Sequence, residues 1–403
     1  MSTLSKGRYK YILTFLSQIT NVTIPLWTGE NILILHPVFC GSHESVLRSL
    51  GNHLVQQGHQ VTQVLFKHKK SPKELNTNVS IFTLTINDNL NNCGRYVNDK
   101  GVLDTGIAWG KYFWNQGHSI FSLPLDLFCL IDVHCYTLHH DPQLKHLLKT
   151  QTFDLAIIDL IGNECGIALV KSLQVPIIGF WGFPFHGGEA AYTSLFHPPS
   201  LYPAFFSGLQ MKMNFGERFV NFILHLLHRL YTDFLLAYAN SYVNQYYPHI
   251  PPLNKIIHDL DLILVNANQF VDYPRLVPPN IKQVGGLQLM PDESGSLPKD
   301  YQDFVFGAEE GVILFSFGSS LNAKDVPQSV ILALLEAFSS LKQYRFVMSF
   351  DPEAIPYIPD NVKVSKWVPQ QALLAHPNVV AFISHCGISS LLEAVYYSVP
   401  IGK

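Results

Sequence analysis

One segment near the C-terminal end constrains the fold of this chain more than any other. Residues 367–400 read WVPQQALLAHPNVVAFISHCGISSLLEAVYYSVP, which predicts a short helix, an apolar strand, a polar turn at 385–387 and a second helix. A strand that enters a helix through a glycine-containing turn leaves backbone N–H groups free at the positive end of the helix dipole. Such a turn can hold a diphosphate, so the segment predicts a nucleotide site on an α/β fold.

Alternating apolar strands and amphipathic helices extend this pattern over most of the chain. A strand at 31–36, a helix at 44–57 and a strand at 60–66 form a βαβ unit, which indicates a parallel sheet. The alternation restarts at 311–317, after a stretch rich in Gly, Pro and Ser. The expected organisation is an N-terminal domain at 30–286, a linker at 287–298 and a C-terminal domain at 299–403.

Charge and cysteine content exclude several classes of protein. The formal net charge is −3 and the 27 Lys and Arg residues form no dense cluster, so we expect no nucleic-acid partner. The six cysteines include no C-x-x-C pair, which argues against a disulfide framework or a zinc ribbon. His134, Cys135, His139 and His140 share one short window, but without a second ligand cluster they favour a polar helix face over a metal site.

The N-terminal residues carry a weak export signal. Lys6, Arg8 and Lys10 precede a short apolar run. We therefore interpret residues 1–29 as a signal peptide, with a ragged first strand as the alternative. A glycosylation sequon at Asn78 has meaning only in the secretory pathway. No later apolar run is long enough to cross a bilayer.

The C-terminal segment resembles the donor-binding signature of the UDP-glycosyltransferases. Its two elements, W-x-P-Q-x-x-x-L-x-H and F-x-[ST]-H-x-G-x-x-S-x-x-E, are both present, and weaker likeness covers 31–66, 153–179, 272–286 and 311–319. The resemblance implies an enzyme that transfers a hexosyl group, with inversion, from a UDP-sugar to a small acceptor. The apolar residues at 180–181 and 183–185 suggest that this acceptor is lipophilic. It implies two facing Rossmann-like domains, the arrangement called GT-B, with the acceptor in the first and the nucleotide in the second.

The same resemblance carries expectations about the surroundings of the enzyme. The chain is expected in the endoplasmic reticulum lumen or elsewhere in the secretory pathway. Membrane association is expected by analogy, although this chain contains no spanning segment. Neither a metal nor another cofactor is expected, because the helix dipole and backbone N–H groups can replace a cation at the diphosphate.

Two residues are candidates for the catalytic pair. His43 lies at a junction between strand and helix, where the positive end of the helix favours a neutral ring that can accept a proton; from spacing alone a capping residue is equally consistent. The resemblance implies that His43 is the general base. Asp159 ends an apolar strand and could be a helix cap, but bound to the far nitrogen of His43 it would orient the imidazole.

The donor is expected to bind to residues of the C-terminal signature. Trp367 can stack on uracil, Gln370 can reach the base or ribose, and the carboxylate of Glu393 can accept hydrogen bonds from both ribose hydroxyls. The phosphates are expected to contact Ser319, His385 and Ser390, with Gly387 allowing the backbone to approach, and Ser389 is expected in the same donor site.

Two features depart from the family pattern. Ser398 stands where most members have glycine, and the chain stops at Lys403, before the acidic residue and glutamine that hold the sugar. The resemblance therefore implies a second domain that is incomplete at its C-terminus. Two hypotheses stay open: a fragment of an active enzyme, or a catalytically inactive relative that binds UDP or a partner. The sequence identifies neither the sugar nor the acceptor.

Overall fold

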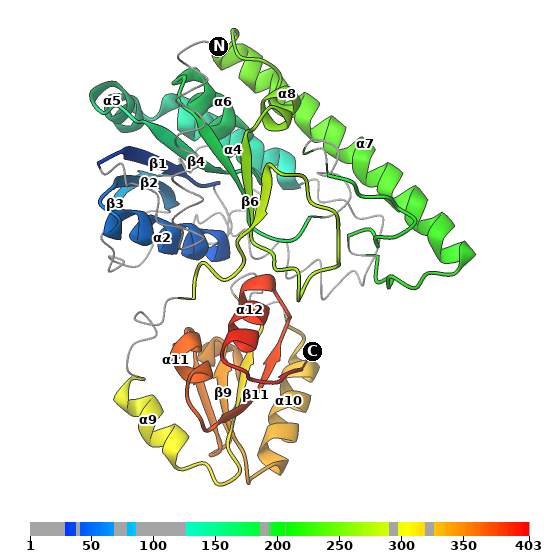
Figure 1. The fold of residues 1–403 in the computed structure, drawn as a ribbon. Coiled ribbons are helices and arrows are strands. Elements are labelled where there is room, and N and C mark those ends of the chain that lie inside the picture. Colours follow the sequence, from blue (N-terminus) through cyan, green and yellow to red (C-terminus); the bar gives the residue numbers. More distant parts are fainter. Residues whose placement is uncertain are drawn as a thin grey trace. The chain divides into compact units, whose positions relative to one another are not determined.

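The computed structural model describes two compact units, which divide between Val284 and Gly285. The described residues are 29–37, 41–67, 79–85, 126–185, 193, 195–205, 207–289, 297–318 and 326–402. Each unit is built on one parallel sheet (Figure 1). The expected α/β fold with two Rossmann-like sheets is confirmed. The predicted signal peptide and the sequon at Asn78 lie outside the described residues.

The sheet of the first unit has seven parallel strands in the order β3-β2-β1-β4-β5-β6-β7. The order reverses between β1 and β4, so the carboxyl ends of these two strands lie side by side at a topological switch point. Ligands of open α/β sheets bind at such a point. The strands are β1 (Asn31–Leu35), β2 (Gln60–Lys67), β3 (Ser80–Thr85), β4 (Leu155–Asp159), β5 (Ile177–Trp181), β6 (Leu262–Val265) and β7 (Ile281–Gln283).

Helices cover both faces of this sheet (Figure 1). One helix packs against β2, whereas four others pack with one another on the opposite face. Because both faces are covered, β1 and β4 are apolar except at Asn31 and Asp159, and they are buried along nearly their whole length. The helices are α2 (Gly41–Gln56), α4 (Asp126–His140), α5 (Pro142–Thr150), α6 (Glu164–Ser172), α7 (Phe215–Tyr246) and α8 (Leu253–His258).

One boundary differs from the sequence prediction in a way that matters for the site. Helix α2 begins at Gly41, three residues earlier than expected, so His43 belongs to the first turn of the helix and not to a loop before it. No proline separates Gly41 from the rest of the helix, so nothing in the sequence prevents the extra turn. The side chain of His43 is thereby held by regular backbone.

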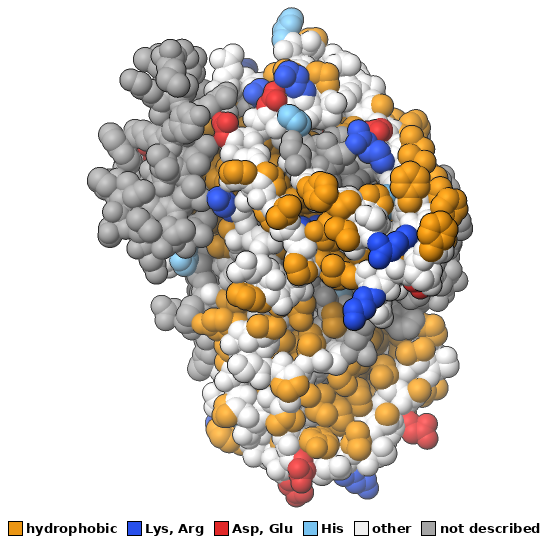
Figure 2. Space-filling model, turned by 45° about the vertical axis from the view of Figure 1, so that its right-hand side comes forward, with side chains coloured by type: hydrophobic (Ala, Val, Ile, Leu, Met, Phe, Trp, Pro, Cys, Tyr) orange, Lys and Arg blue, Asp and Glu red, His pale blue; other side chains and the backbone are white. Residues whose placement is uncertain are grey.

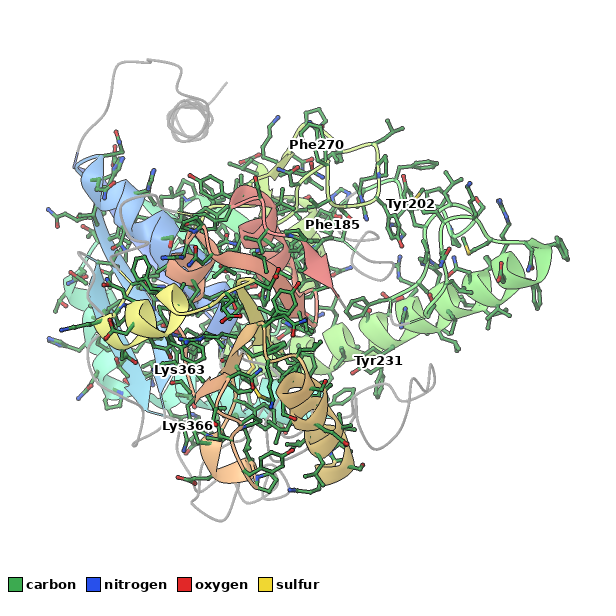
Figure 3. The ribbon with its side chains drawn as sticks, turned by 90° about the horizontal axis from the view of Figure 1, so that it is seen from below. Phe185, Tyr202, Tyr231, Phe270, Lys363 and Lys366 are labelled. Atoms are coloured by element: carbon green, nitrogen blue, oxygen red, sulfur yellow. A yellow bond between two sulfur atoms is a disulfide. The ribbon has the colours of Figure 1, made fainter. Side chains whose placement is uncertain are left out.

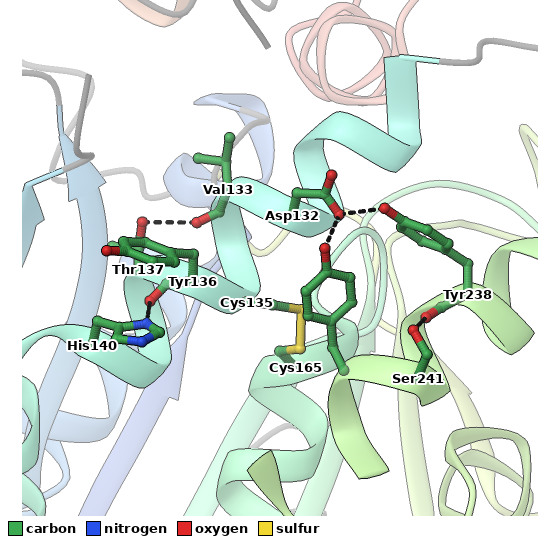
Figure 4. Close-up of a disulfide and its surroundings, with 10 residues drawn as sticks. Asp132, Val133, Cys135, Tyr136, Thr137, His140, Cys165, Tyr238 and Ser241 are labelled. Atoms are coloured by element: carbon green, nitrogen blue, oxygen red, sulfur yellow. Dashed lines mark hydrogen bonds between the residues drawn. A yellow bond between two sulfur atoms is a disulfide. The ribbon is translucent and has the colours of Figure 1, made fainter. Parts of the chain in front are cut away.

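A disulfide between Cys135 and Cys165 joins α4 to α6 (Figure 4). The sequence argued against a disulfide framework, and this pair corrects that expectation. The two cysteines are separated by 30 residues, and their spacing matches no disulfide motif. Only the packing of α4 on α6 brings their Cα atoms to 5.2 Å. Nearby, Asp132 of α4 accepts hydrogen bonds of 2.7 Å from the hydroxyls of both Tyr238 and Tyr242, which ties α4 to α7.

The surface of the first unit includes an apolar helix face. Helix α7 starts with a capping box in which Asn214 and Glu217 bond to each other's backbone N–H groups. Beyond this cap, Phe215, Phe219 and Phe234 of α7 are all more than half exposed. Figure 2 shows hydrophobic side chains at the surface, with Lys and Arg side chains among them. Among the described helices, none is both long and apolar enough to cross a membrane.

The sheet of the second unit has five parallel strands in the order β10-β9-β8-β11-β12. This order reverses between β8 and β11, as the first sheet does between β1 and β4. The strands are β8 (Val312–Ser316), β9 (Arg345–Ser349), β10 (Val362–Ser365), β11 (Val379–Ser384) and β12 (Ile401–Gly402). The helices are α9 (Lys299–Phe306), α10 (Gln328–Ser340), the 3-10 turn η4 (Pro352–Ala354), α11 (Gln370–Leu374) and α12 (Ile388–Tyr396).

Candidate functional site

The two predicted catalytic residues meet at the switch point of the first sheet. Asp159 is the last residue of β4 and is fully buried, and His43 points to it from the first turn of α2. Nδ1 of His43 lies 2.6 Å from Oδ2 of Asp159, and the other carboxylate oxygen accepts a 3.1 Å hydrogen bond from the backbone N–H of Ile161. A carboxylate can only accept, so Nδ1 carries the shared proton and Nε2 keeps a free lone pair.

A second buried histidine lies close to this pair. Burial is the main cause that lowers the pKa of His36, the residue after β1, to about 3, with smaller contributions from positive charge at Arg48 and, when it is protonated, at His43. The amide nitrogen of Gln63 lies 2.6 Å from Nε2 of the His36 ring. His36 therefore stays neutral near neutral pH, so it does not oppose a positive charge on His43.

An aromatic wall adjoins the imidazole of His43. The rings of Phe183 and Phe180 lie 5.6 Å and 6.4 Å from it. Phe183 also contacts the rings of Trp181, at 6.0 Å, and Phe205, at 6.2 Å. The histidine thus faces apolar surface that an apolar ligand could contact.

One arginine fixes the loops that carry this wall. Arg275 donates a 2.8 Å hydrogen bond to the carbonyl of Phe185, and its guanidinium lies 5.2 Å from the ring centre of Tyr202. Both aromatic residues are labelled in Figure 3. The side chain of Arg275 also pairs with Asp272 at 3.2 Å. The loops that carry Phe185, Tyr202 and Asp272 therefore share one charged centre.

In the second unit, three predicted donor residues form a hydrogen-bonded cluster. The amide of Gln370, the first residue of α11, donates to Oε2 of Glu393 at 2.6 Å and to Oγ of Ser390 at 3.2 Å. Burial raises the pKa of the Glu393 carboxyl to about 7, and the hydrogen bond from Gln370 partly opposes that rise. Trp367, three residues before Gln370, is 78% exposed, so one face of its indole is open to a ligand.

The predicted phosphate-binding turn connects β11 to α12. The ring of His385 lies between two glycines, because a Cβ atom at Gly318 or at Gly387 would overlap its atoms. Burial lowers the pKa of His385, an effect partly offset by the backbone of Ser316. The ring is therefore neutral, and the close approach of backbone on both sides requires glycine. Ser319 lies outside the described residues.

A residue that the sequence analysis missed connects this turn to α11. Gln288 is buried, donates to the carbonyl of Ser389 at 3.3 Å, and accepts a 3.0 Å hydrogen bond from Gln371 on its backbone oxygen. It lies within the predicted linker at 287–298, so the start of that segment packs into the second unit. No local pattern in the sequence distinguishes Gln288 from a linker glutamine.

The histidine-rich window on α4 has a structural explanation. His134 is buried and its ring lies 5.0 Å from that of Phe66, whereas the ring of His139 stacks on Tyr246 at 3.8 Å. Within the described part of the chain, no group of three or more His, Cys, Asp or Glu side chains could hold a metal ion. The expectation that the enzyme needs no metal stays a prediction.

Comparison with known families and proteins gives a consistent match. The family model described as "UDP-glucoronosyl and UDP-glucosyl transferase" matches residues 32–402. The UDP-glucosyltransferase 2 of Dactylopius coccus is 29% identical over 384 residues, which are 93% of this chain and 69% of the relative. The 2-hydroxyacylsphingosine 1-beta-galactosyltransferase of Mus musculus is 27% identical and covers 93% of this chain and 66% of its own length. The chain thus spans about two thirds of these relatives.

Solved structures share the fold. A UDP-glucosyltransferase from Polygonum tinctorium, described as capable of glucosylating indoxyl, superposes with a TM-score of 0.55 at 14% identity, over 93% of this chain and 80% of its own. The Phytolacca americana UGT2, complexed with UDP-2fluoro-glucose and pterostilbene, gives 0.54 at 15% identity, with the same coverage. At this level of identity the likeness concerns the fold alone.

Proposed function

We propose that this chain, which belongs to the UDP-glucoronosyl and UDP-glucosyl transferase family, transfers a hexosyl group from a UDP-sugar to a hydroxyl of a small lipophilic acceptor. Family membership supports the donor. The observation that carries the chemistry is the buried pair of His43 and Asp159 beside an aromatic wall. The named relatives are glucosyl- and galactosyltransferases, so the identity of the sugar is left open.

The pair can perform general base catalysis. Nε2 of His43 accepts the proton of the acceptor hydroxyl while Asp159, bonded to Nδ1 at 2.6 Å, stabilises the resulting imidazolium. The acceptor oxygen forms a bond to the anomeric carbon of the sugar as the bond from that carbon to the diphosphate breaks, and UDP leaves as an anion. A single displacement of this kind inverts the configuration at the anomeric carbon.

The second unit offers groups suited to the donor. Trp367 presents an open indole for uracil, and Glu393 with Gln370 presents a carboxylate and an amide for the ribose hydroxyls. The turn at 385–387 precedes α12, whose positive dipole end favours the diphosphate. Ser319 and Ser390 are assigned to the phosphates, and Ser389 to the donor site, by the family signature alone. This arrangement supports donor binding without a metal ion or other cofactor.

The aromatic wall next to His43 supports a lipophilic acceptor. Phe183 contacts the imidazole directly, and Trp181 and Phe205 extend the apolar surface from it. An acceptor that combines a hydroxyl with an apolar body would bury that body against these rings, and roughly 25 cal/mol is gained for each Å² of apolar surface removed from water.

The disulfide supports a place in the secretory pathway, including the lumen of the endoplasmic reticulum. A bond such as that between Cys135 and Cys165 persists in oxidising compartments and is rare in the cytosol. Thiol labelling of the protein isolated from cells under denaturing conditions tests this proposal. If Cys135 and Cys165 react as free thiols while other secreted proteins in the same cells keep their disulfides, the assignment is wrong.

Donor binding and turnover can be tested separately. Titration calorimetry with UDP in excess chelator should show binding, and a strict requirement for a divalent metal would contradict the proposed donor site. Incubation with UDP-glucose, UDP-galactose or UDP-glucuronic acid and a lipophilic phenol should give a glycoside of inverted configuration, which NMR coupling constants identify. Binding of UDP without transfer or hydrolysis of any donor would favour the catalytically inactive relative.

A further inference from the structure

Gly182, the residue after β5, lies directly against the imidazole of His43. A Cβ atom at this position would overlap three ring atoms of His43, namely Cε1, Nε2 and Nδ1. The backbone of Gly182 does not adopt a positive φ, so its conformation is open to any residue. Glycine is therefore required at this position because the imidazole occupies the space of a side chain, and not because the backbone conformation excludes other residues.

Asn266 holds Gly182 in this position from the neighbouring strand. It follows β6, is 1% exposed, and its side-chain amide donates a 3.1 Å hydrogen bond to the carbonyl of Gly182. The backbone N–H of Asn266 donates to the carbonyl of Trp181 at 2.8 Å. Two consecutive carbonyls, at the end of β5 and just after it, are thus anchored to the residue that follows β6, which fixes the surface on which the imidazole rests.

The ring of His43 has little freedom to avoid a new side chain. It is bonded to Asp159 at 2.6 Å and bordered by Phe180 and Phe183. A methyl group at Gly182 would push the ring away from its seat, and any such movement lengthens or misaligns the bond to the buried, immobile carboxylate of Asp159. The imidazole is therefore held on one side by a carboxylate and on another by bare backbone.

We infer that Gly182 and Asn266 are positioning residues for the general base: Gly182 provides the seat on which the imidazole of His43 lies, and Asn266 fixes that seat. The inference rests on the proposed role of His43. Catalytic geometry tolerates little error, because a displacement of about 1 Å can reduce the rate by about a hundredfold. Neither residue belongs to the second unit, so UDP affinity should not depend on them.

The test compares Gly182→Ala with the matched variant Gly216→Ala. Gly216 lies in the first turn of α7, has no positive φ, and a Cβ there would meet only the Asn214 side chain at an ordinary 3.4 Å. Gly182→Ala should lower kcat by about a hundredfold and leave UDP binding unchanged. Gly216→Ala should change neither. Asn266→Asp, which removes the amide donor at nearly constant shape, should lower kcat by roughly tenfold.

Imidazole NMR of histidine-labelled protein provides a readout that does not require turnover. The signals of His43 are identified by their loss in His43→Gln, and they should shift in Gly182→Ala and Asn266→Asp but not in Gly216→Ala. Unchanged His43 signals in both folded variants would overturn the inference. If the signals shift but the transfer rate does not change, Gly182 and Asn266 still position the ring, but His43 is not the general base. If Gly182→Ala does not fold, Asn266→Asp decides by the same spectra.

Discussion

The two units each place a histidine at the carboxyl edge of a parallel sheet, and the two residues differ in what surrounds them. His43 of the first unit is bonded to the buried carboxylate of Asp159 at 2.6 Å. His385 of the second unit lies between Gly318 and Gly387, and within residues 297–318 and 326–402 no carboxylate pairs with its ring. Both rings rest on glycine backbone, but only one has an acidic partner.

Under the proposed function, this difference assigns proton transfer to one histidine and donor binding to the other. An imidazole with a carboxylate behind it can take up a proton, because the charge that forms is compensated. Burial lowers the pKa of His385, so that ring stays neutral and can only exchange a hydrogen bond with a phosphate oxygen. Similar positions in similar sheets therefore imply different tasks, and the nearest carboxylate is the feature that distinguishes them.

The sharpest way to break the comparison is to replace each histidine with glutamine. His43→Gln should lower the transfer rate by about a thousandfold with unchanged UDP affinity, because the proposed general base is lost. His385→Gln should weaken UDP binding by only about tenfold, the value of one hydrogen bond. Steady-state kinetics and calorimetry on the same preparations measure both. Equal rate losses for the two variants would remove the distinction drawn here.

Removal of the disulfide should lower the stability of the first unit and not that of the second. Cys135→Ala with Cys165→Ala should lower the free energy of unfolding of the first unit by about 3 kcal/mol, since the bond closes a loop of 30 residues. The described cysteine of the second unit, Cys386, is free, so UDP binding should persist. Urea titration with and without reductant measures the effect. Reductant should not alter the double variant, and an unchanged parent would show that the bond contributes nothing.

The substitution Asp159→Asn sharpens the comparison, because it leaves His43, like His385, without a carboxylate partner. The amide preserves shape but no longer compensates the imidazolium, and it can present an N–H to Nδ1, which selects the wrong tautomer. Transfer should fall by about a hundredfold. Imidazole NMR should show that the tautomer of His43 has changed, whereas a change in UDP affinity would indicate a wider structural disturbance.

The smallest expected effect concerns the pH dependence of UDP binding. The pKa of Glu393 is raised to about 7 by burial, so the free carboxyl is largely protonated below pH 7. Ribose hydroxyls donate to the ionised form, so binding releases the proton, and UDP affinity should rise with pH by at most tenfold per unit up to about 7. Calorimetry in two buffers of different ionisation enthalpy measures the proton. Glu393→Gln should remove this dependence.

The raised pKa of Glu393 in the folded protein also affects stability. Because its pKa in the folded chain lies above the ordinary 4.5, the folded state holds the proton more tightly than the unfolded state does. The contribution to the free energy of unfolding is therefore full below pH 4.5 and is lost as the pH rises through 7. A melting temperature of Glu393→Gln that falls as steeply as that of the parent would contradict this account.

Much of the fold could be predicted because apolar strands buried on both faces differ clearly from amphipathic helices. The strands now seen as β1, β2, β4, β8 and β11 were all expected within a few residues. Strand β7 spans only Ile281–Gln283 and is too short to produce a pattern. Its place in the sheet depends on pairing with β6, which a local pattern does not reveal.

Site residues could be predicted only where their chemistry requires a recognisable sequence pattern. His43 and Asp159 were candidates from their positions after or at the end of apolar strands, and the family resemblance implied their roles. Their contact at 2.6 Å depends on the reversal of strand order between β1 and β4. Gly182 and Asn266 could not be found, because a glycine after a strand has many explanations and an asparagine 84 residues away supplies its partner only in space. Gln288 and the Cys135–Cys165 bond were missed for the same reason.

The exposure of Trp367 makes it a natural optical reporter. It is the only tryptophan in the sequence after Gly285, and its indole is 78% exposed, so it should emit at the long wavelengths typical of indoles in water. Trp181 of the first unit is buried and should emit at shorter wavelengths. A base that stacks on Trp367 should quench emission at long wavelengths. Because Trp27, Trp109 and Trp114 also emit, the part of this quenching that disappears in Trp367→Phe would report donor occupancy without any label.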